Sequence, residues 1–387
     1  MAPHDSVPAP LAGLRVLDLA TVLAGPNCAR YLGDFGADVI KVERPDGGDS
    51  MRRFAWIDER TGESMWWQLV NRNKRTVALD LKDPADVAVL LGLVDDADVL
   101  VENFRPGTLE RLGLGPGVLH ARNPRLVVTR VTGFGQTGPY RQRPGFATVA
   151  ESMSGLAAIS GVPDGQPLLP PIALTDELTG LAAAFATMVA LHSGVGQVVD
   201  VSLVESLLQV MSPLVTLFGL TGEQQQRLGA GLPYSVPRGT YQCADGGWVG
   251  LSTSSESVAA RVLRVLGVHD DPRFVDFAAR MQHRDELEQI MTAWCTARPR
   301  DEVIATFTAA EAAIGPVMTM ADIAVDEHYR ARDAIVDLEG TPMQGLLAKL
   351  SATPGVLRWK GRGLDEDGDA IRASGWDAFG DGSPSNR

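Results

Sequence analysis

The chain has 387 residues, of which 45% are hydrophobic and 21% charged, and it carries a formal net charge of −13. This length can bury a large core and accommodate two domains, whereas the negative charge argues against nucleic acid as a partner because phosphates would be repelled. No apolar run reaches the roughly 18–20 residues of a membrane span, and no export signal is visible, so we expect a cytoplasmic protein with no membrane attachment.

The first half of the chain alternates strand and helix patterns. Apolar runs predict strands at residues 14–19, 38–43, 77–81, 99–101, 126–131 and 197–203. Helices are expected from Pro26 to about residue 35 and at about 84–94. This alternation predicts an α/β fold with a doubly wound, mostly parallel sheet.

The composition changes after residue 208. Residues 212–237 are rich in Gly, Pro and Gln, which predicts a linker, and Asp245-Gly246-Gly247 predicts a hairpin between strands at 240–244 and 248–252. Helical patterns follow to about residue 307. We therefore expect a large domain over 1–211, the linker, a small α+β domain over 238–330, and a return to the large domain over 331–387 with a frayed tail from 381.

No metal site is expected. Cys28, Cys243 and Cys295 lie far apart without a CxxC motif or a nearby His, which argues against both a zinc site and a disulfide framework. The acidic stretch 365–369 lacks the Gly and Glu of a calcium loop.

An acidic residue stands at the start of a long apolar helix pattern. Thr175 is a good N-cap, and Asp176 would then fall in the first turn of a helix that continues through the apolar run 181–191. The helix dipole and amide hydrogen bonds would keep this carboxylate ionised, and an ionised carboxylate facing a cleft can act as a nucleophile. Because Asp is also common in first turns for purely structural reasons, the residues alone leave both roles open.

A glycine-rich turn follows the strand predicted at 126–131. Gly133, Gly135 and Gly138 complete a GxGxxG pattern, but residues 139–144 cannot open the helix that a dinucleotide pyrophosphate needs. We expect a flexible turn at the carboxyl edge of the sheet, where open α/β sheets bind ligands. Its backbone amides could stabilise an oxyanion.

Cations gather at two places. Arg72, Lys74 and Arg75 form one cluster just before a predicted strand, and residues 101–143 hold seven Arg against two Glu. Such groups can neutralise phosphates and suggest a small anionic ligand in an acidic protein. A solvated basic surface is the alternative for either cluster.

Five further motifs accompany the opening strand and helix in a fixed order. The opening is Leu14–Leu19 with Ala24-Gly25-Pro26 and LGDFGADVIKVE from Leu32, and it is followed by NRNKRTVALDLK from Asn71, LVENFRPG from Leu100, TGFGQTGPY from Thr132, the Asp176 segment, and GPVMTMADIAVDEH from Gly315. In these motifs the chain resembles the family III CoA-transferases, which include formyl-CoA transferase and alpha-methylacyl-CoA racemase.

The resemblance implies a large domain built from both chain ends around an inserted small domain, and an interlocked homodimer. It implies an acyl-CoA and a carboxylic acid as substrates, with Asp176 acylated to a mixed anhydride and then to an aspartyl-CoA thioester. It also implies a CoA site lined by Arg44, Leu79, Lys82, Asn103, Phe104 and Arg111, to which we add the cations Lys41, Arg72, Lys74 and Arg75.

At three positions the chain differs from named branches of the family, and these differences argue against the activities of those branches. Phe146 and Ala147 stand where the racemase branch has a His–Asp pair, and they cannot move protons. Formyl-CoA transferase has Gln at Leu23 and Tyr at Phe146, so a formyl/oxalate pair is not expected, although both positions would still line the substrate pocket. We predict a CoA-transferase, with an acyl-CoA isomerase or a non-catalytic CoA-binding protein as alternatives.

Overall fold

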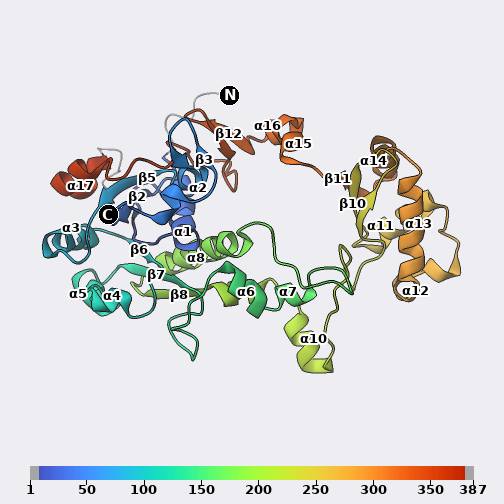
Figure 1. Ribbon diagram of the computed structural model, residues 1–387, viewed down its shortest axis with the longest axis horizontal. Helices are drawn as coiled ribbons and strands as arrows, with labels where there is room; N and C mark the ends of the chain where they lie inside the picture. Colours follow the sequence, from blue (N-terminus) through green and yellow to red (C-terminus); the bar gives the residue numbers. More distant parts are fainter. Residues whose placement is uncertain (1–7, 380–387) are drawn as a thin grey trace. The chain divides into compact units, whose positions relative to one another are not determined.

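The computed structural model describes residues 8–379, which form two compact units. The first unit comprises the chain up to Gly155, Pro170–Ser212 and the chain from His328 onward, and the second comprises Leu156–Leu169 and Pro213–Glu327. The first unit is thus built from both ends of the chain, and the second unit is inserted between them in the sequence (Figure 1). Residues 156–169 belong to the second unit, although we expected them in the large domain. The predicted frayed tail lies outside the described residues.

The first unit contains a six-stranded parallel sheet. Its strands, in spatial order, are β5 (Lys74–Ala78), β2 (Asp38–Glu43), β1 (Arg15–Asp18), β6 (Val99–Glu102), β7 (Val127–Thr132) and β8 (Val198–Ser202). All five pairings are parallel, which confirms the predicted α/β class. In chain order the strands run 3-2-1-4-5-6, so the order reverses between β1 and β6, and such a switch point is where doubly wound sheets bind ligands.

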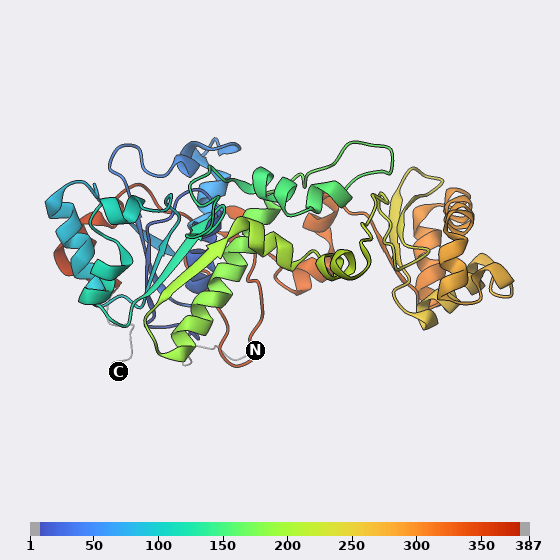
Figure 2. The ribbon, with the colours of Figure 1, turned by 90° about the horizontal axis from the view of Figure 1, so that it is seen from below.

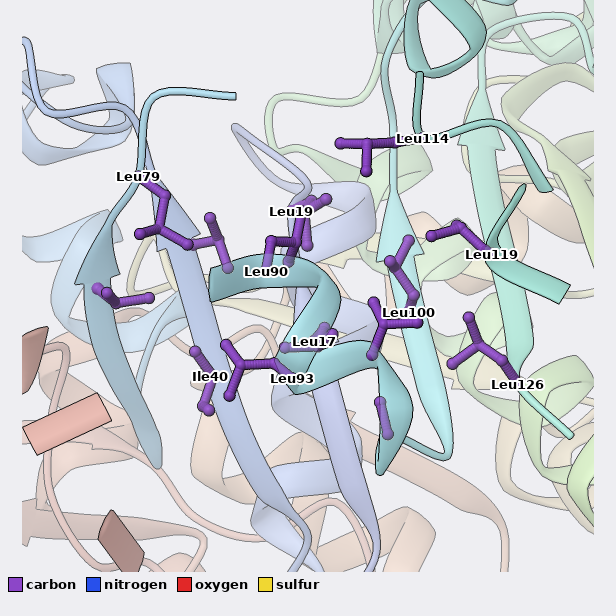
Figure 3. Close-up of a cluster of buried hydrophobic side chains, with 14 of the residues drawn as sticks. Leu17, Leu19, Ile40, Leu79, Leu90, Leu93, Leu100, Leu114, Leu119 and Leu126 are labelled. Atoms are coloured by element: carbon purple, nitrogen blue, oxygen red, sulfur yellow. The ribbon is translucent and has the colours of Figure 1, made fainter. Parts of the chain in front are cut away.

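A leucine-rich core covers one face of this sheet (Figure 3). Helix α3 (Pro84–Asp95) lays Leu90 and Leu93 over Leu17 and Leu100 of the strands. Helices α5 (Pro116–Arg122) and α17 (Gly368–Ser374) complete the layer. Strands β1, β2, β6 and β7 are almost fully buried because both faces of the sheet are covered there.

Helices α1 (Ala24–Asp34) and α8 (Leu174–Ser193) lie on the opposite face, with α8 alongside β7 and β8 (Figures 1 and 2). They approach closely because residue 180 is glycine: a Cβ there would lie 2.6 Å from the Asn27 Cβ and 2.9 Å from the Ala24 carbonyl oxygen. An ion pair of 3.3 Å between Arg30 and Glu177 joins the same two helices. The first turn of α8 is thereby fixed to α1.

The C-terminal segment closes the edge of the sheet at β5. The Thr76 N–H donates to Asp367 at 3.0 Å, the Asn73 N–H donates to the Trp359 carbonyl, and the Trp359 indole donates to the Lys74 carbonyl at 3.0 Å. These bonds occupy groups that an edge strand would otherwise leave free.

Shorter elements complete the first unit. They are η1 (Ser50–Arg53), β3 (Ile57–Asp58), β4 (Glu63–Ser64), α2 (Met65–Val70), α4 (Thr108–Arg111), α6 (Ala147–Met153), α9 (Leu203–Gln209), β12 (Ile335–Leu338), β13 (Thr341–Gln344) and η3 (Gly375–Phe379). Helix α16 (Glu327–Ala331) lies at the boundary of the two units.

The second unit is a small α+β domain. Its antiparallel sheet has the order β11 (Ala313–Pro316), β10 (Trp248–Ser252) and β9 (Gly239–Gln242), which confirms the hairpin predicted around residues 245–247. Its helices are α7 (Leu156–Ile159), α10 (Leu214–Thr221), α11 (Glu256–Leu266), η2 (Pro272–Phe274), α12 (Phe277–Gln282), α13 (Arg284–Thr296), α14 (Arg300–Ala309) and α15 (Met320–Val325). The stretch predicted as a linker therefore contains a helix, α10.

Helix α8 is long and apolar enough to cross a membrane by length and composition, and α9 with α10 would pass the same test as one broken span. The buried side of α8 rests on α1 and β7, as in a core helix. Its exposed side carries Leu181, Phe185 and Val189 one turn apart, with exposed fractions of 37%, 70% and 53%. This apolar stripe is left uncovered within the first unit.

The close contact between α1 and α8 predicts the effect of adding one methyl group. Gly180→Ala should lower the free energy of unfolding by about 1–3 kcal/mol, because the new Cβ overlaps α1. Gly92→Ala in α3 is the matched control, since its Cβ would meet no atom within 4 Å, and it should raise stability by about 0.5–1 kcal/mol. Chemical denaturation at one fixed protein concentration measures both, and equal effects would contradict the packing argument.

Candidate active site

Four charged side chains lie buried between the sheet and α1, at the carboxyl end of β1. Lys74 Nζ is 2.8 Å from the Asp18 carboxylate, and Lys41 Nζ lies 3.7 Å from Asp18 and 3.3 Å from Asp49. Burial lowers the pKa of Lys74 to about 8 even though Asp18 opposes it. Burial acts in the same direction on Lys41, but Asp18 and Asp49 outweigh it and raise its pKa. Each charge in this buried cluster depends on the others for compensation.

The same cluster holds the loop between β1 and α1. The Val22 N–H donates to both oxygens of Asp49, at 3.3 and 3.2 Å. Asn103 exchanges two hydrogen bonds with the backbone of Thr21, at 2.8 and 2.6 Å. Val22 has φ of +68°, a left-handed conformation that β-branched residues rarely adopt. Such strain persists only where surrounding contacts enforce it, and it is common at functional sites.

A cavity of about 670 Å³ opens beside this loop, at the carboxyl ends of β1, β2, β5 and β6. It therefore lies at the switch point of the sheet. Leu19, Leu79, Leu81, Phe104 and Leu112 supply its apolar walls. Arg44 and Lys82 are its exposed cations. This combination suits a ligand with a flat apolar ring and phosphates.

Half of the residues predicted for a CoA site line this cavity: Lys41, Arg44, Leu79, Lys82 and Phe104. Asn103 and Arg111 lie next to it, because Asn103 holds the lining residue Thr21 and Arg111 precedes the lining residue Leu112.

The cluster Arg72, Lys74 and Arg75 lies elsewhere. Arg72 is fully buried and binds both oxygens of Asp34, at 2.9 and 2.6 Å. Arg75 pairs with Asp367 at 3.4 Å, and Lys74 belongs to the buried cluster. None of the three lines the cavity. Their charges hold the fold together, and this geometry does not support the prediction that they bind phosphates.

Asp176 is half-buried in the first turn of α8. The N-cap residue is Ala173 and not Thr175, whose hydroxyl instead donates to Glu151 Oε1 at 2.8 Å. Within residues 8–379 we find no ion pair or side-chain hydrogen bond to the Asp176 carboxylate. Burial raises the pKa of Asp176 to about 6, and the negative charges of Glu177 and Glu151 add to the effect. The expectation that the helix terminus keeps this group fully ionised is therefore corrected, since protonation competes below about pH 6.

In the glycine-rich turn after β7, two backbone amides donate hydrogen bonds to side chains of the protein. The Gly135 N–H donates to Thr132 Oγ1 at 2.9 Å, and the Gln136 N–H donates to Asp200 at 2.9 Å. Gly133 packs against Gly145, where a Cβ would lie 2.7 Å from the Gly145 Cα. Gly135 and Gly138 both have positive φ, as their turn requires. Two of the amides expected at an oxyanion are thus already engaged.

The two predicted pocket residues lie in different surroundings. Leu23 is buried in a cluster that also contacts Ala173, the N-cap of α8. Phe146 is exposed and is the N-cap of α6, the helix that carries Glu151. The sequence analysis missed Asp49 and Glu151, because a single acid in a loop or a short helix carries no distinguishing pattern.

Comparisons with known proteins identify the family and the fold of the chain. The family model described as CoA-transferase family III matches residues 11–367. The chain is 40% identical to a succinyl-CoA–D-citramalate CoA-transferase and 39% identical to the beta subunit of a succinyl-CoA–L-malate CoA-transferase, both from Chloroflexus aurantiacus, over 93% and 94% of this chain and 92% and 93% of theirs. A crystal structure of a CaiB/BaiF family protein from Brucella suis is 31% identical, with a TM-score of 0.84, and the match covers 95% of this chain and 99% of that one.

Two kinds of cation should respond differently to substitution. Arg44→Ala should raise KM for a CoA thioester severalfold and leave thermal unfolding unchanged, because Arg44 is exposed in the cavity. Lys74→Met should lower the free energy of unfolding by about 3–5 kcal/mol, because Asp18 loses its nearest cation in the interior. Steady-state kinetics and denaturation test the pair, and an unchanged KM in the Arg44 variant would remove it from the binding site.

Proposed function

Because the chain belongs to CoA-transferase family III, we propose that Asp176 is the nucleophile of its transfer reaction and that the cavity at the switch point holds the nucleotide of CoA. The protein is a CoA-transferase that moves CoA from an acyl-CoA donor to a carboxylic acid. The observation that carries the proposal is the state of Asp176, a half-buried carboxylate at a helix start with no cation paired to it. An anion in such a place is poorly stabilised, and it is reactive for that reason.

The reaction would proceed in two symmetrical halves. The Asp176 carboxylate attacks the thioester carbonyl of the donor and releases CoA thiolate, which leaves a mixed anhydride. The thiolate then attacks the Asp176 carbonyl of the anhydride, which releases the donor acid and leaves an aspartyl-CoA thioester. The acceptor carboxylate repeats these steps in reverse. Covalent catalysis thereby replaces one difficult exchange with easier steps.

We propose a dicarboxylate pair as substrates. Two relatives at 40% and 39% identity are named for succinyl-CoA together with citramalate or malate, all of which carry a second carboxylate. Leu23 and Phe146 differ from the residues expected for a formyl/oxalate pair, in keeping with a different pair of acids.

Asp176→Asn tests the nucleophile. The amide has nearly the same shape but cannot attack a thioester, so transfer should fall by several orders of magnitude while CoA binding persists. Hydroxylamine added during turnover should modify Asp176 in the wild type. Asp369→Asn, at an exposed position, is the control and should keep full activity. Near-normal transfer by the Asp176 variant would refute the assignment.

We also propose that the enzyme is a homodimer of the interlocked type expected from its family. The apolar stripe Leu181, Phe185 and Val189 on α8 supports this, because exposed apolar stripes of this size mark interaction surfaces. One relative is named as the beta subunit of its enzyme, which is therefore an assembly of more than one chain. A second copy of the chain would cover the stripe.

Mass photometry at nanomolar concentration should therefore show a species of twice the 41.3 kDa chain mass. Phe185→Glu should reduce the dimer fraction, because a charge cannot be buried against an apolar partner. Val118→Glu, half-exposed on α5 across the sheet, should leave the mass unchanged. A folded, active wild-type monomer would contradict the proposal.

A further inference from the structure

One buried acid beside Asp176 has no place in the transfer steps above. Glu151, on α6, is only 3% exposed, and its carboxylate accepts the hydrogen bond from Thr175, the residue before Asp176. Helix α6 packs against α8, so Glu151 is held at the first turn that carries the nucleophile. A carboxylate costs free energy to bury, and placing it near a second acid raises that cost further.

Among the described residues, Glu177 on α8 has a cation as its partner, whereas Glu205 on α9 has only a hydroxyl donor. Glu177, the next residue, lies 3.3 Å from Arg30 Nη2 and accepts a hydrogen bond from the Tyr31 hydroxyl at 3.4 Å, both from α1. Helix α9 carries Glu205 alone, and Ser202 donates to it at 2.5 Å. Glu151 has no ion-pair partner within residues 8–379. Its charge is therefore left to act on Asp176.

We propose that Glu151 is a positioning residue whose negative charge, held by Thr175 next to Asp176, drives the enzyme toward its aspartyl-CoA thioester by like-charge repulsion. This inference rests on the proposed function of Asp176. The exchange converts the Asp176 carboxylate and the acyl-CoA into the Asp176–CoA thioester and the free donor carboxylate. The thioester bond of the donor breaks, an equivalent bond forms at Asp176, and the negative charge leaves with the acid. Repulsion by Glu151 is relieved in the product, and Glu151 itself is unchanged.

The same repulsion acts on protonation. Both protonation and thioester formation remove one negative charge from Asp176, so a neighbouring charge favours both to a similar degree. The pKa of Asp176 is raised to about 6, by burial first and by Glu177 and Glu151 in addition. Removing the Glu151 charge should lower that pKa and move the acid limb of activity to lower pH. It should also reduce the thioester, by about tenfold for each pH unit of the shift.

Two variants separate charge from hydrogen bonding. Glu151→Gln removes the charge but keeps an oxygen that can accept from Thr175, and Thr175→Val removes the hydrogen bond but keeps the charge. We would measure the acid limb of kcat/KM and, by intact mass, the ratio of CoA-bound to free enzyme at equal succinyl-CoA and succinate. We expect Glu151→Gln to shift both readouts by matching factors. Thr175→Val keeps the acid but removes the hydrogen bond that stabilises its charge, so it should shift the acid limb in the same direction by a smaller amount. A Glu151→Gln enzyme with both readouts unchanged would overturn the inference, as would equal shifts in the two variants.

Two further measurements keep the test decisive. Glu151→Asp retains the charge and should restore the wild-type acid limb. If Glu151→Gln does not fold, the double variant Glu151→Met with Thr175→Val removes both polar partners together, which buried pairs tolerate far better than loss of one, and it should show the same two shifts. A wild-type enzyme with no CoA adduct at all would refute the proposed function of Asp176, whereas equal adducts in wild type and Glu151→Gln would refute only the role of Glu151.

Discussion

The rest of the site depends on the compensation of buried charge at the carboxyl end of β1. Asp18, Lys41, Lys74 and Asp49 are all inside the protein, and each is tolerable only because an opposite charge lies within 4 Å. The cluster does more than neutralise itself, because Asp49 also accepts the N–H of Val22. A strained backbone between β1 and α1 is thereby fixed by groups that cannot move without exposing a charge to the interior.

Helix α1 connects this charge cluster to the turn that carries Asp176. Pro26 of α1 accepts a hydrogen bond from Lys74, while Arg30 further along the same helix pairs with Glu177 on α8. The missing side chain at Gly180 lets the two helices touch. A rigid connection therefore joins the side of the sheet that carries the cavity to the turn that carries Asp176. Precise placement of a nucleophile by rigid elements is what covalent catalysis requires.

The charged residues fall into two groups: those paired with an opposite charge stabilise the fold, and Asp176 has no such partner among the described residues. Arg72, Lys74 and Arg75 are bound to carboxylates and serve the fold. Asp176 is only half-buried and faces other acids, and burial with like charge raises its pKa to about 6. Among the described residues, the stabilisation that buried salt bridges give to other carboxylates is absent at Asp176, the proposed nucleophile. Glu151 is buried without a cation partner among the described residues, and it lies beside the like-charged Asp176.

The sequence alone determined the α/β class, the succession of strands along the chain, the hairpin and the helix that carries Asp176 in its first turn, because these follow from local patterns of apolar and turn residues. The family motifs led to the predictions of a CoA site and of a covalent mechanism.

Only the tertiary structure showed which charged and polar side chains pair with one another. β5 begins at Lys74, three residues before its apolar pattern, since a lysine can occupy a buried strand when Asp18 from another strand pairs with it. Thr175 lies inside α8, which begins at Leu174, and its hydroxyl donates a hydrogen bond to Glu151, 24 residues away in sequence, instead of capping the helix. Such pairings join residues that no local window contains, so they become visible only once the chain is folded.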